Sequence, residues 1–232
     1  MGFLFSRLIR NIVIAYVLFS GVQYLLRWKS YNISPKEFRN IAHKAQGADN
    51  VASAVSRLTT DLRRVYGPAI AAETTWVSLY LGNLPLKALF LHSSLTEFIV
   101  VMGTPFPTSG RIGMHWSNST CTVLTGSVTR LADLGHMPNK ETFSAGGNFR
   151  HGQFESYIYS LGAETYVVCY GRGVTPVSGL WAATGALANG EPFTLARMLY
   201  TYGHESFNQL SLALTHTFNY YKAKATGKKT EL

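Results

Sequence analysis

The sequence predicts a mainly β domain that is flanked by helices and preceded by an apolar helix. Three patterns support this prediction. Residues 11–26 carry no charge, and residues 35–66 repeat apolar side chains at helical spacing. Residues 74–171 instead break into short runs rich in β-branched and aromatic residues, separated by Gly, Pro, Asn and Ser. Several short strands with such punctuation are typical of a barrel or a sandwich.

The composition indicates that part of the surface meets lipid. The 232-residue chain is 47% hydrophobic and only 14% charged, against about 25% charged in typical soluble domains. Its net charge is +9, but the basic residues gather near the two ends and form no stripe. We therefore expect a lipid bilayer, and no nucleic acid, as a partner.

Residues 1–30 are predicted to form a transmembrane anchor. The uncharged run between Arg10 and Arg27 is shorter than the ~20 residues of a full span, but arginine side chains at its ends can reach the interface. A cleaved signal peptide is the alternative, although no good small-residue cleavage site is present. The first acidic residue is Glu37, and an acid-free N-terminus with arginines is also a feature of mitochondrial import signals.

Residues 31–73 are predicted to lead into the β region as a helical segment. Ser34 and Pro35 mark the start of the helix, Gly47 marks a break, and Gly67 marks its end.

Residues 74–175 are predicted to form the β domain. Within it, Gly162-Ala163-Glu164 is interpreted as a hairpin turn between the last two strands. The strand candidates include Thr96–Met102, Thr120–Val128, Phe154–Ser160 and Thr165–Tyr170.

Residues 176–221 return to helical spacing, with candidates at Val177–Asn189 and Pro192–Tyr221. These helices are either buried in a core or lie in a membrane interface. The basic tail at residues 222–232 favours the interface.

The cysteine and histidine content predicts no metal site and no cofactor. Cys121 and Cys169 are too few for a disulfide framework, and the seven histidines are scattered. The segment Tyr170–Pro176 contains glycines at the wrong spacing for a phosphate loop, so we interpret it as a tight corner between a strand and a helix.

Five collinear motifs resemble one family, the fungal sterol delta-8/delta-7 isomerases and the non-opioid sigma receptor. The similarity covers roughly residues 37–220. The motifs are Ser56–Arg64, His92–Thr104, Ser109–Arg111 with Trp116, His151–Glu155 and Tyr170–Pro176.

This resemblance implies a cupin-like β-barrel with a buried apolar interior that holds a ligand. It also implies a preceding transmembrane helix and two C-terminal helices that close the barrel and rest on the membrane. The family's isomerases move a ring double bond of a sterol with two buried carboxylates, one of which stays protonated. The residues expected to line the pocket are Phe98, Trp116, Cys121, His151, Tyr159, Leu161 and Cys169.

The chain departs from the family where the carboxylates belong. Cys121 and Cys169 occupy the two acid positions, and Phe98 replaces a tyrosine that steadies one acid. No catalytic residue is therefore predicted. The favoured interpretation is that two separate thiols serve as plain apolar lining; the alternative is that they form a disulfide or redox pair.

We therefore expect a non-catalytic pseudoenzyme with a structural or accessory role, such as a subunit of a larger membrane complex, and a lipid- or sterol-holding barrel. One alternative is an active isomerase that relies on His151 or Glu155, and another is a sigma-like receptor for small ligands. The family implies the endoplasmic reticulum, and the N-terminus makes the mitochondrial inner membrane an equal expectation. The segment Gly82–Leu86 lacks the glycines of the family's oligomerising segment, which puts a homo-oligomer in doubt.

Overall fold

The computed structural model describes residues 2–47, 50–132 and 139–225, and it divides the chain into units at residues 1–32 and 33–232. The first unit holds helix α1 (Gly2–Trp28). Its segment Arg7–Trp28 is long and apolar enough to cross a membrane, by length and composition. This agrees with the single N-terminal span expected from the sequence. The Tyr31 hydroxyl follows the helix and donates to the Leu26 carbonyl at 2.9 Å.

The second unit begins with helices α2 (Pro35–Ala45) and α3 (Val51–Tyr66), followed by the short turn η1 (Gly67–Ala69). The predicted break lies between the helices, where Gly47 adopts a φ of 75°. Asn50 starts α3 by accepting a hydrogen bond from the Ser53 amide at 2.8 Å. Ser34 precedes α2 as predicted, although its side chain makes no capping bond.

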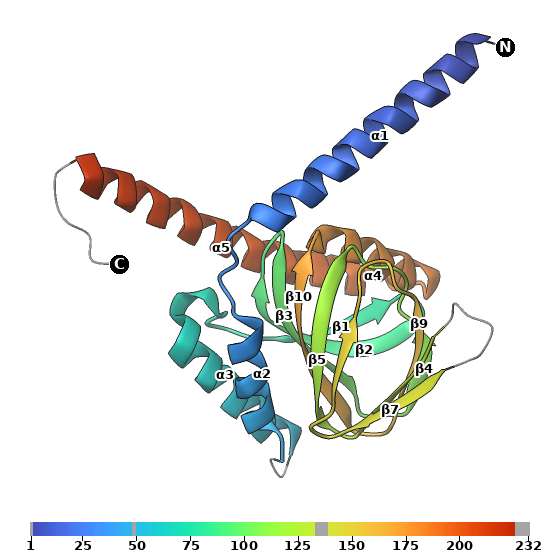
Figure 1. The fold of residues 1–232 in the computed structure, drawn as a ribbon. Coiled ribbons are helices and arrows are strands. Elements are labelled where there is room, and N and C mark those ends of the chain that lie inside the picture. The colour runs from blue at the N-terminus through green and yellow to red at the C-terminus, as the bar shows by residue number, and fades with distance from the viewer. Residues whose placement is uncertain (1, 48–49, 133–138, 226–232) are drawn as a thin grey trace. The chain divides into compact units, whose positions relative to one another are not determined.

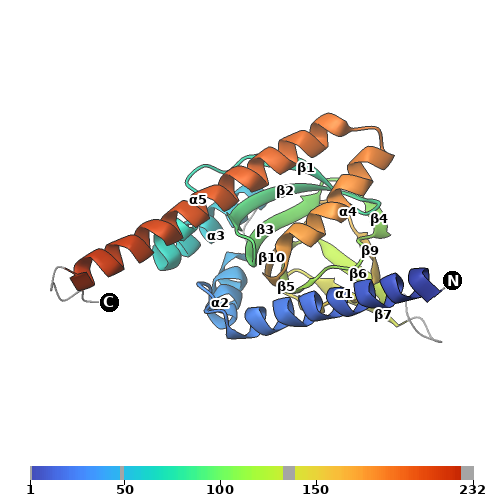
Figure 2. The same ribbon diagram turned by 90° about the horizontal axis from the view of Figure 1, so that it is seen from above.

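The described residues of the β region form two antiparallel sheets (Figures 1 and 2). The six-stranded sheet runs in the order β1 (Trp76–Leu81), β2 (Leu84–Ser93), β3 (Glu97–Thr104), β10 (Thr165–Gly173), β5 (Ser117–Thr125) and β8 (Asn148–His151). The four-stranded sheet runs in the order β4 (Thr108–Arg111), β9 (Tyr157–Leu161), β6 (Ser127–Ala132) and β7 (Lys140–Ser144).

The predicted hairpin at Gly162–Glu164 is wrong, because the two strands that flank the turn do not pair with each other. A turn is present, with Glu164 exposed at a φ of 49°, but β9 pairs with β4 and β6 whereas β10 pairs with β3 and β5. Likewise, the predicted strand Thr120–Val128 is two strands separated at Gly126, which has a φ of 72°. Both turns carry the chain from one sheet to the other. The turn at residues 162–164 was predicted with the wrong strand pairing, and the turn at Gly126 was not predicted.

The six-stranded sheet is covered on both faces, which explains its nearly continuous apolar strands. Along β10, Val167 and Cys169 belong to the inner core, between the sheets. Val168 and Tyr170 alternate with them and belong to the outer core, where the sheet meets α2 and α3.

The C-terminal helices α4 (Thr175–Ala188) and α5 (Pro192–Ala225) close one side of the barrel. Ala182 of α4 and Met198 of α5 join the inner core. The Gln209 side chain holds the middle of α5 by donating to the Ala69 carbonyl at 3.0 Å. After that contact, α5 exposes apolar side chains such as Leu214 and Phe218. Of the predicted basic tail, residues 226–232 lie outside the described residues.

Candidate ligand cavity

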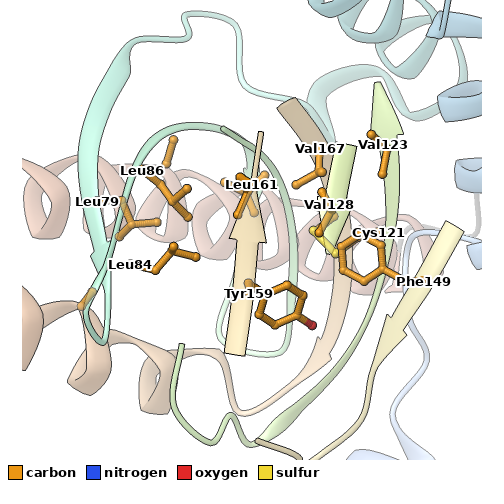
Figure 3. Close-up of a cluster of buried hydrophobic side chains, with 14 of the residues drawn as sticks. Leu79, Leu84, Leu86, Cys121, Val123, Val128, Phe149, Tyr159, Leu161 and Val167 are labelled. Carbon is orange, nitrogen blue, oxygen red and sulfur yellow. A yellow bond between two sulfur atoms is a disulfide. The ribbon is translucent and has the colours of Figure 1, made fainter. Parts of the chain in front are cut away.

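A cavity of about 240 Å³ lies between the two sheets and is bounded by α4 and α5. Its wall is mostly aliphatic and aromatic, as Figure 3 shows for part of it. The apolar lining residues, the two cysteines apart, are Leu79, Leu81, Leu84, Leu86, Phe90, Phe98, Val100, Met102, Ile112, Val128, Phe149, Leu161, Val167, Pro176, Gly179, Ala182, Met198 and Leu199.

Most of the residues expected at the pocket share this wall. They are Phe98, Cys121, His151, Tyr159, Leu161 and Cys169. Trp116 is the exception, since it does not line the cavity. Its ring lies 6.0 Å from that of Phe154, and its carbonyl accepts a hydrogen bond from the Val174 amide at 2.7 Å. Trp116 therefore supports the corner before α4 from outside the cavity.

Cys121 and Cys169 form a disulfide in the cavity wall. They lie directly opposite each other on β5 and β10, with their Cα atoms 4.1 Å apart, and both are buried. The favoured interpretation, two separate thiols, is therefore wrong, and the alternative of a disulfide pair is correct. The pair still contributes to an apolar wall, because neither sulfur carries a proton or a charge.

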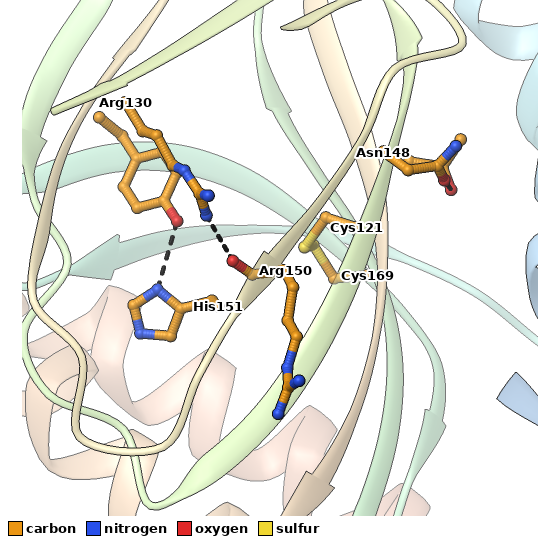
Figure 4. Close-up of a disulfide and its surroundings, with 8 residues drawn as sticks. Cys121, Arg130, Asn148, Arg150, His151 and Cys169 are labelled. Carbon is orange, nitrogen blue, oxygen red and sulfur yellow. Dashed lines mark hydrogen bonds between the residues drawn. A yellow bond between two sulfur atoms is a disulfide. The ribbon is translucent and has the colours of Figure 1, made fainter. Parts of the chain in front are cut away.

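No carboxylate is among the described residues that line the cavity. Glu155, the acid considered for a catalytic role, is exposed. Its Oε2 atom accepts from the Gly152 amide at 2.6 Å and from the Tyr157 hydroxyl at 3.2 Å. Glu155 thus closes a turn after β8 and does not reach the cavity wall. Figure 4 shows the disulfide, His151 and their surroundings.

Two buried histidines are the main polar groups of the wall. His151 Nδ1 lies 3.2 Å from the Tyr159 hydroxyl. His115, which the sequence reasoning missed, lies 3.0 Å from the Ile112 carbonyl through Nε2 and 2.9 Å from the Ser178 hydroxyl through Nδ1. The two imidazole rings are 5.5 Å apart. In the sequence, only its position directly before Trp116 connects His115 with the expected pocket.

Burial lowers the pKa of both histidines to about 4, so both rings are neutral at pH 7. For His115, the bond to the Ile112 carbonyl opposes this effect. For His151, the neighbouring His115 lowers the pKa further, while Glu155 acts in the opposite direction. Burial also raises the pKa of Tyr159, whose hydroxyl therefore keeps its proton.

Most of the Tyr170–Pro176 motif has a structural role away from the cavity, and only its last two residues line the wall. The Tyr170 hydroxyl donates to Glu97 Oε1 at 2.7 Å, and Arg172 donates from Nη2 to the Ile33 carbonyl at 2.6 Å. Glu97 is buried and lies 4.0 Å from Arg172 Nε. Gly173 has a φ of 149°, and a Cβ there would overlap the chain at the start of β5. The motif fastens the start of the second unit to the barrel and forms the predicted corner.

The fold and the cavity define a β-barrel protein with an apolar interior and a helix long enough to cross a membrane. The model of the family described as ERG2 and Sigma1 receptor like protein matches residues 9–213. The chain belongs to this family, and the resemblance seen in the sequence motifs is confirmed.

Individual relatives agree with this assignment. The chain is similar to the sigma non-opioid intracellular receptor 1 of Taricha granulosa, with 27% identity over 223 residues, 94% of this chain and 97% of the relative. The Xenopus tropicalis receptor of the same name is 29% identical over 189 residues, 79% of this chain and 84% of the relative. Among solved structures, an RmlC-like cupin from Shewanella frigidimarina overlaps with a TM-score of 0.37 and 14% identity, over 44% of this chain and 85% of that one.

Proposed function

We propose that this chain is a non-catalytic family member that holds one apolar lipid or sterol-like molecule inside its barrel. The observation that carries the proposal is the Cys121–Cys169 disulfide, which occupies both positions where the resemblance places proton-handling carboxylates. A disulfide can neither donate nor accept a proton, and it cannot stabilise a carbocation by charge. Losing several kcal/mol of such electrostatic support is decisive, because each 1.36 kcal/mol is about tenfold in rate.

The cavity wall supports the lipid-holding part of the proposal. Its lining is almost entirely aliphatic and aromatic, and burial of apolar ligand surface contributes roughly 25 cal/mol per Å². Both wall histidines are neutral at pH 7 because burial lowers their pKa to about 4. A protonated amine would therefore find no counter-charge among the described lining residues, which argues against a sigma-like receptor for cationic ligands.

The accessory role is supported by the surface that α5 leaves uncovered. The exposed apolar side chains of α5 include Leu199, Tyr200, Phe207, Leu210, Leu214 and Phe218. A set of this kind marks contact with a bilayer or with another membrane protein. We propose that α1 spans the membrane and that α5 meets lipid or a further subunit of a membrane complex.

The disulfide also bears on the compartment. Disulfides persist in oxidising compartments and are rare in the cytosol. We propose that the barrel faces the oxidising side of its membrane, which is the lumen for the endoplasmic reticulum and the intermembrane space for the mitochondrial inner membrane. Protease protection of the barrel in sealed organelles tests this orientation; digestion from the cytosolic side of intact organelles contradicts it.

A turnover assay tests the central part of the proposal. The purified full chain is incubated with a delta-8 sterol, and bound sterol and delta-7 product are both quantified by mass spectrometry. An active isomerase of the same family, assayed in parallel, shows that the conditions permit turnover. We expect bound sterol without product. Product above the protein-free background refutes the non-catalytic role, and absence of any bound sterol or lipid refutes the lipid-holding role.

A further inference from the structure

Helix α2 holds three cations at a fixed place on the surface of the second unit. The helix lies beside α3 against the six-stranded sheet (Figure 1). Lys36, Arg39 and Lys44 are exposed, and helical spacing places them on the side opposite the buried residues. We call these three residues the cationic face of α2. The buried side chains, which belong to the outer core, are Phe38, Ile41, Ala42 and Ala45.

The cationic face is not neutralised within the described part of the chain. No ion pair joins any of its three residues to an acid among the described residues. Glu37 is the one acid of α2, and its Oε2 atom accepts a hydrogen bond from the Tyr66 hydroxyl at 3.2 Å. Arg130 of the barrel, in contrast, lies 2.5 Å from Glu141. The face therefore keeps a net positive charge that is available to an anionic partner.

The position of α2 in the chain brings this face close to a membrane. Helix α1 ends at Trp28 and α2 begins at Pro35. Whatever the arrangement of the two units, seven residue steps of at most about 3.6 Å keep the start of α2 within about 25 Å of the end of α1. Since α1 is proposed to span the bilayer, α2 starts within reach of the lipid head groups.

The composition of the face indicates lipid head groups rather than a protein surface. Phe38 and Ile41, the only large apolar side chains of α2, are both buried. Protein interfaces are enriched in aromatic residues and Met and depleted of Lys. Groups of Lys and Arg beside a membrane span are instead typical of contacts with anionic phospholipids. The three cations extend over about 12 Å of helix, at about 1.5 Å per residue, so they match a row of head groups better than one small anion.

We propose that the cationic face of α2 binds the head groups of anionic phospholipids in the bilayer that α1 spans. The inference rests on the proposed function, because it requires α1 to cross a membrane, and it adds the class of head group that the second unit meets. Such binding draws the second unit towards the bilayer through charge, and it weakens as salt screens the charges. It does not depend on the molecule held in the cavity.

Lysine acetylation of the full chain in nanodiscs tests this contact at single residues. One set of nanodiscs contains only phosphatidylcholine, and in the other set half of the lipid is phosphatidylglycerol. Peptide mass spectrometry gives the acetylation rates of Lys36 and Lys44, with Lys87, exposed on β2, as the internal control. We expect the anionic nanodiscs to slow acetylation of Lys36 and Lys44 by about fivefold, the factor that corresponds to about 1 kcal/mol per cation. The slowing should disappear at about 1 M salt, where the Debye length is only about 3 Å.

Arg39→Glu tests the face as a unit, because it reverses one charge and leaves both reporter lysines in place. We expect this variant to reduce the slowing at Lys36 and Lys44. Lys140→Glu is the matched control, since Lys140 is exposed on β7 and the substitution makes the same change of charge. It should leave the slowing unchanged.

Equal rates in the two kinds of nanodisc, an equal slowing at Lys87, or the same loss in Lys140→Glu as in Arg39→Glu would each overturn the inference. Slow acetylation in native membranes but not in anionic nanodiscs would indicate an acidic protein partner and would overturn it as well. A chain that enters neither kind of nanodisc would instead refute the proposed span of α1. The comparison of wild-type rates is informative whether or not either variant folds.

Discussion

Reducing the Cys121–Cys169 disulfide should destabilise the barrel substantially. The bond joins residues 48 positions apart in the sequence, and the chain-entropy relation gives about 4 kcal/mol for a closed loop of that length. For a domain of this size, 1 kcal/mol shifts Tm by about 2–4 °C. We therefore expect reduction to lower the Tm of the detergent-purified chain by about 10 °C, measured by tryptophan fluorescence during heating.

The matched control is the double variant Cys121→Ala/Cys169→Ala, which has no disulfide to reduce. Its Tm should be low and should not respond to reductant. Thiol labelling of the denatured wild type should reveal free cysteines only after reduction. Unreduced wild type that labels on both cysteines, or a Tm that is the same with and without reductant, would refute the reasoning.

Three further predictions concern groups outside the disulfide. Glu97→Ala should lower the free energy of unfolding by about 3 kcal/mol, because the substitution removes the buried carboxylate beside the Arg172 guanidinium. An unchanged midpoint of chemical denaturation contradicts this role. The free energy of unfolding should fall as the pH drops from about 6.5 towards 4, because the pKa values of His115 and His151 are lower in the folded than in the unfolded chain. The loss should be about 3 kcal/mol for each ring. A flat stability profile between pH 7 and 5 speaks against neutral buried rings. Gly173→Ala should lower Tm, since its φ of 149° suits glycine; an unchanged Tm would show that the corner tolerates a side chain.

Features set by short stretches of sequence were predicted well. The break at Gly47, the end of α3 at Gly67 and the start of α5 at Pro192 all depend on residues within one turn. The uncharged run of α1 is equally local. Glycine and proline constrain the backbone where they stand, so their effect can be read without knowing the rest of the fold.

The partner of each strand could not be predicted from the local sequence. The turn at residues 162–164 was recognised, yet β9 and β10 belong to different sheets. A turn fixes the local direction of the chain, whereas pairing depends on strands far away in sequence, here β3 and β5 for β10.

The dependence on strand pairing also explains why two separate thiols were predicted instead of a disulfide. Only the register that places Cys121 opposite Cys169 brings the two sulfurs together, and a shift of one residue would have turned one of them to the other face. Most pocket positions followed from the family resemblance, but His115 lies outside the family motifs, and only the fold brings it into contact with Ser178 in the cavity wall.

Native mass spectrometry of the full chain, purified gently from membranes, tests the account most directly. We predict one bound apolar molecule per chain, and its loss in Leu161→Trp, which places an indole in the cavity. Leu95→Trp, at an exposed position, should retain it. An empty wild-type chain, or equal occupancy in wild type and Leu161→Trp with both folded, would contradict a barrel that holds a lipid.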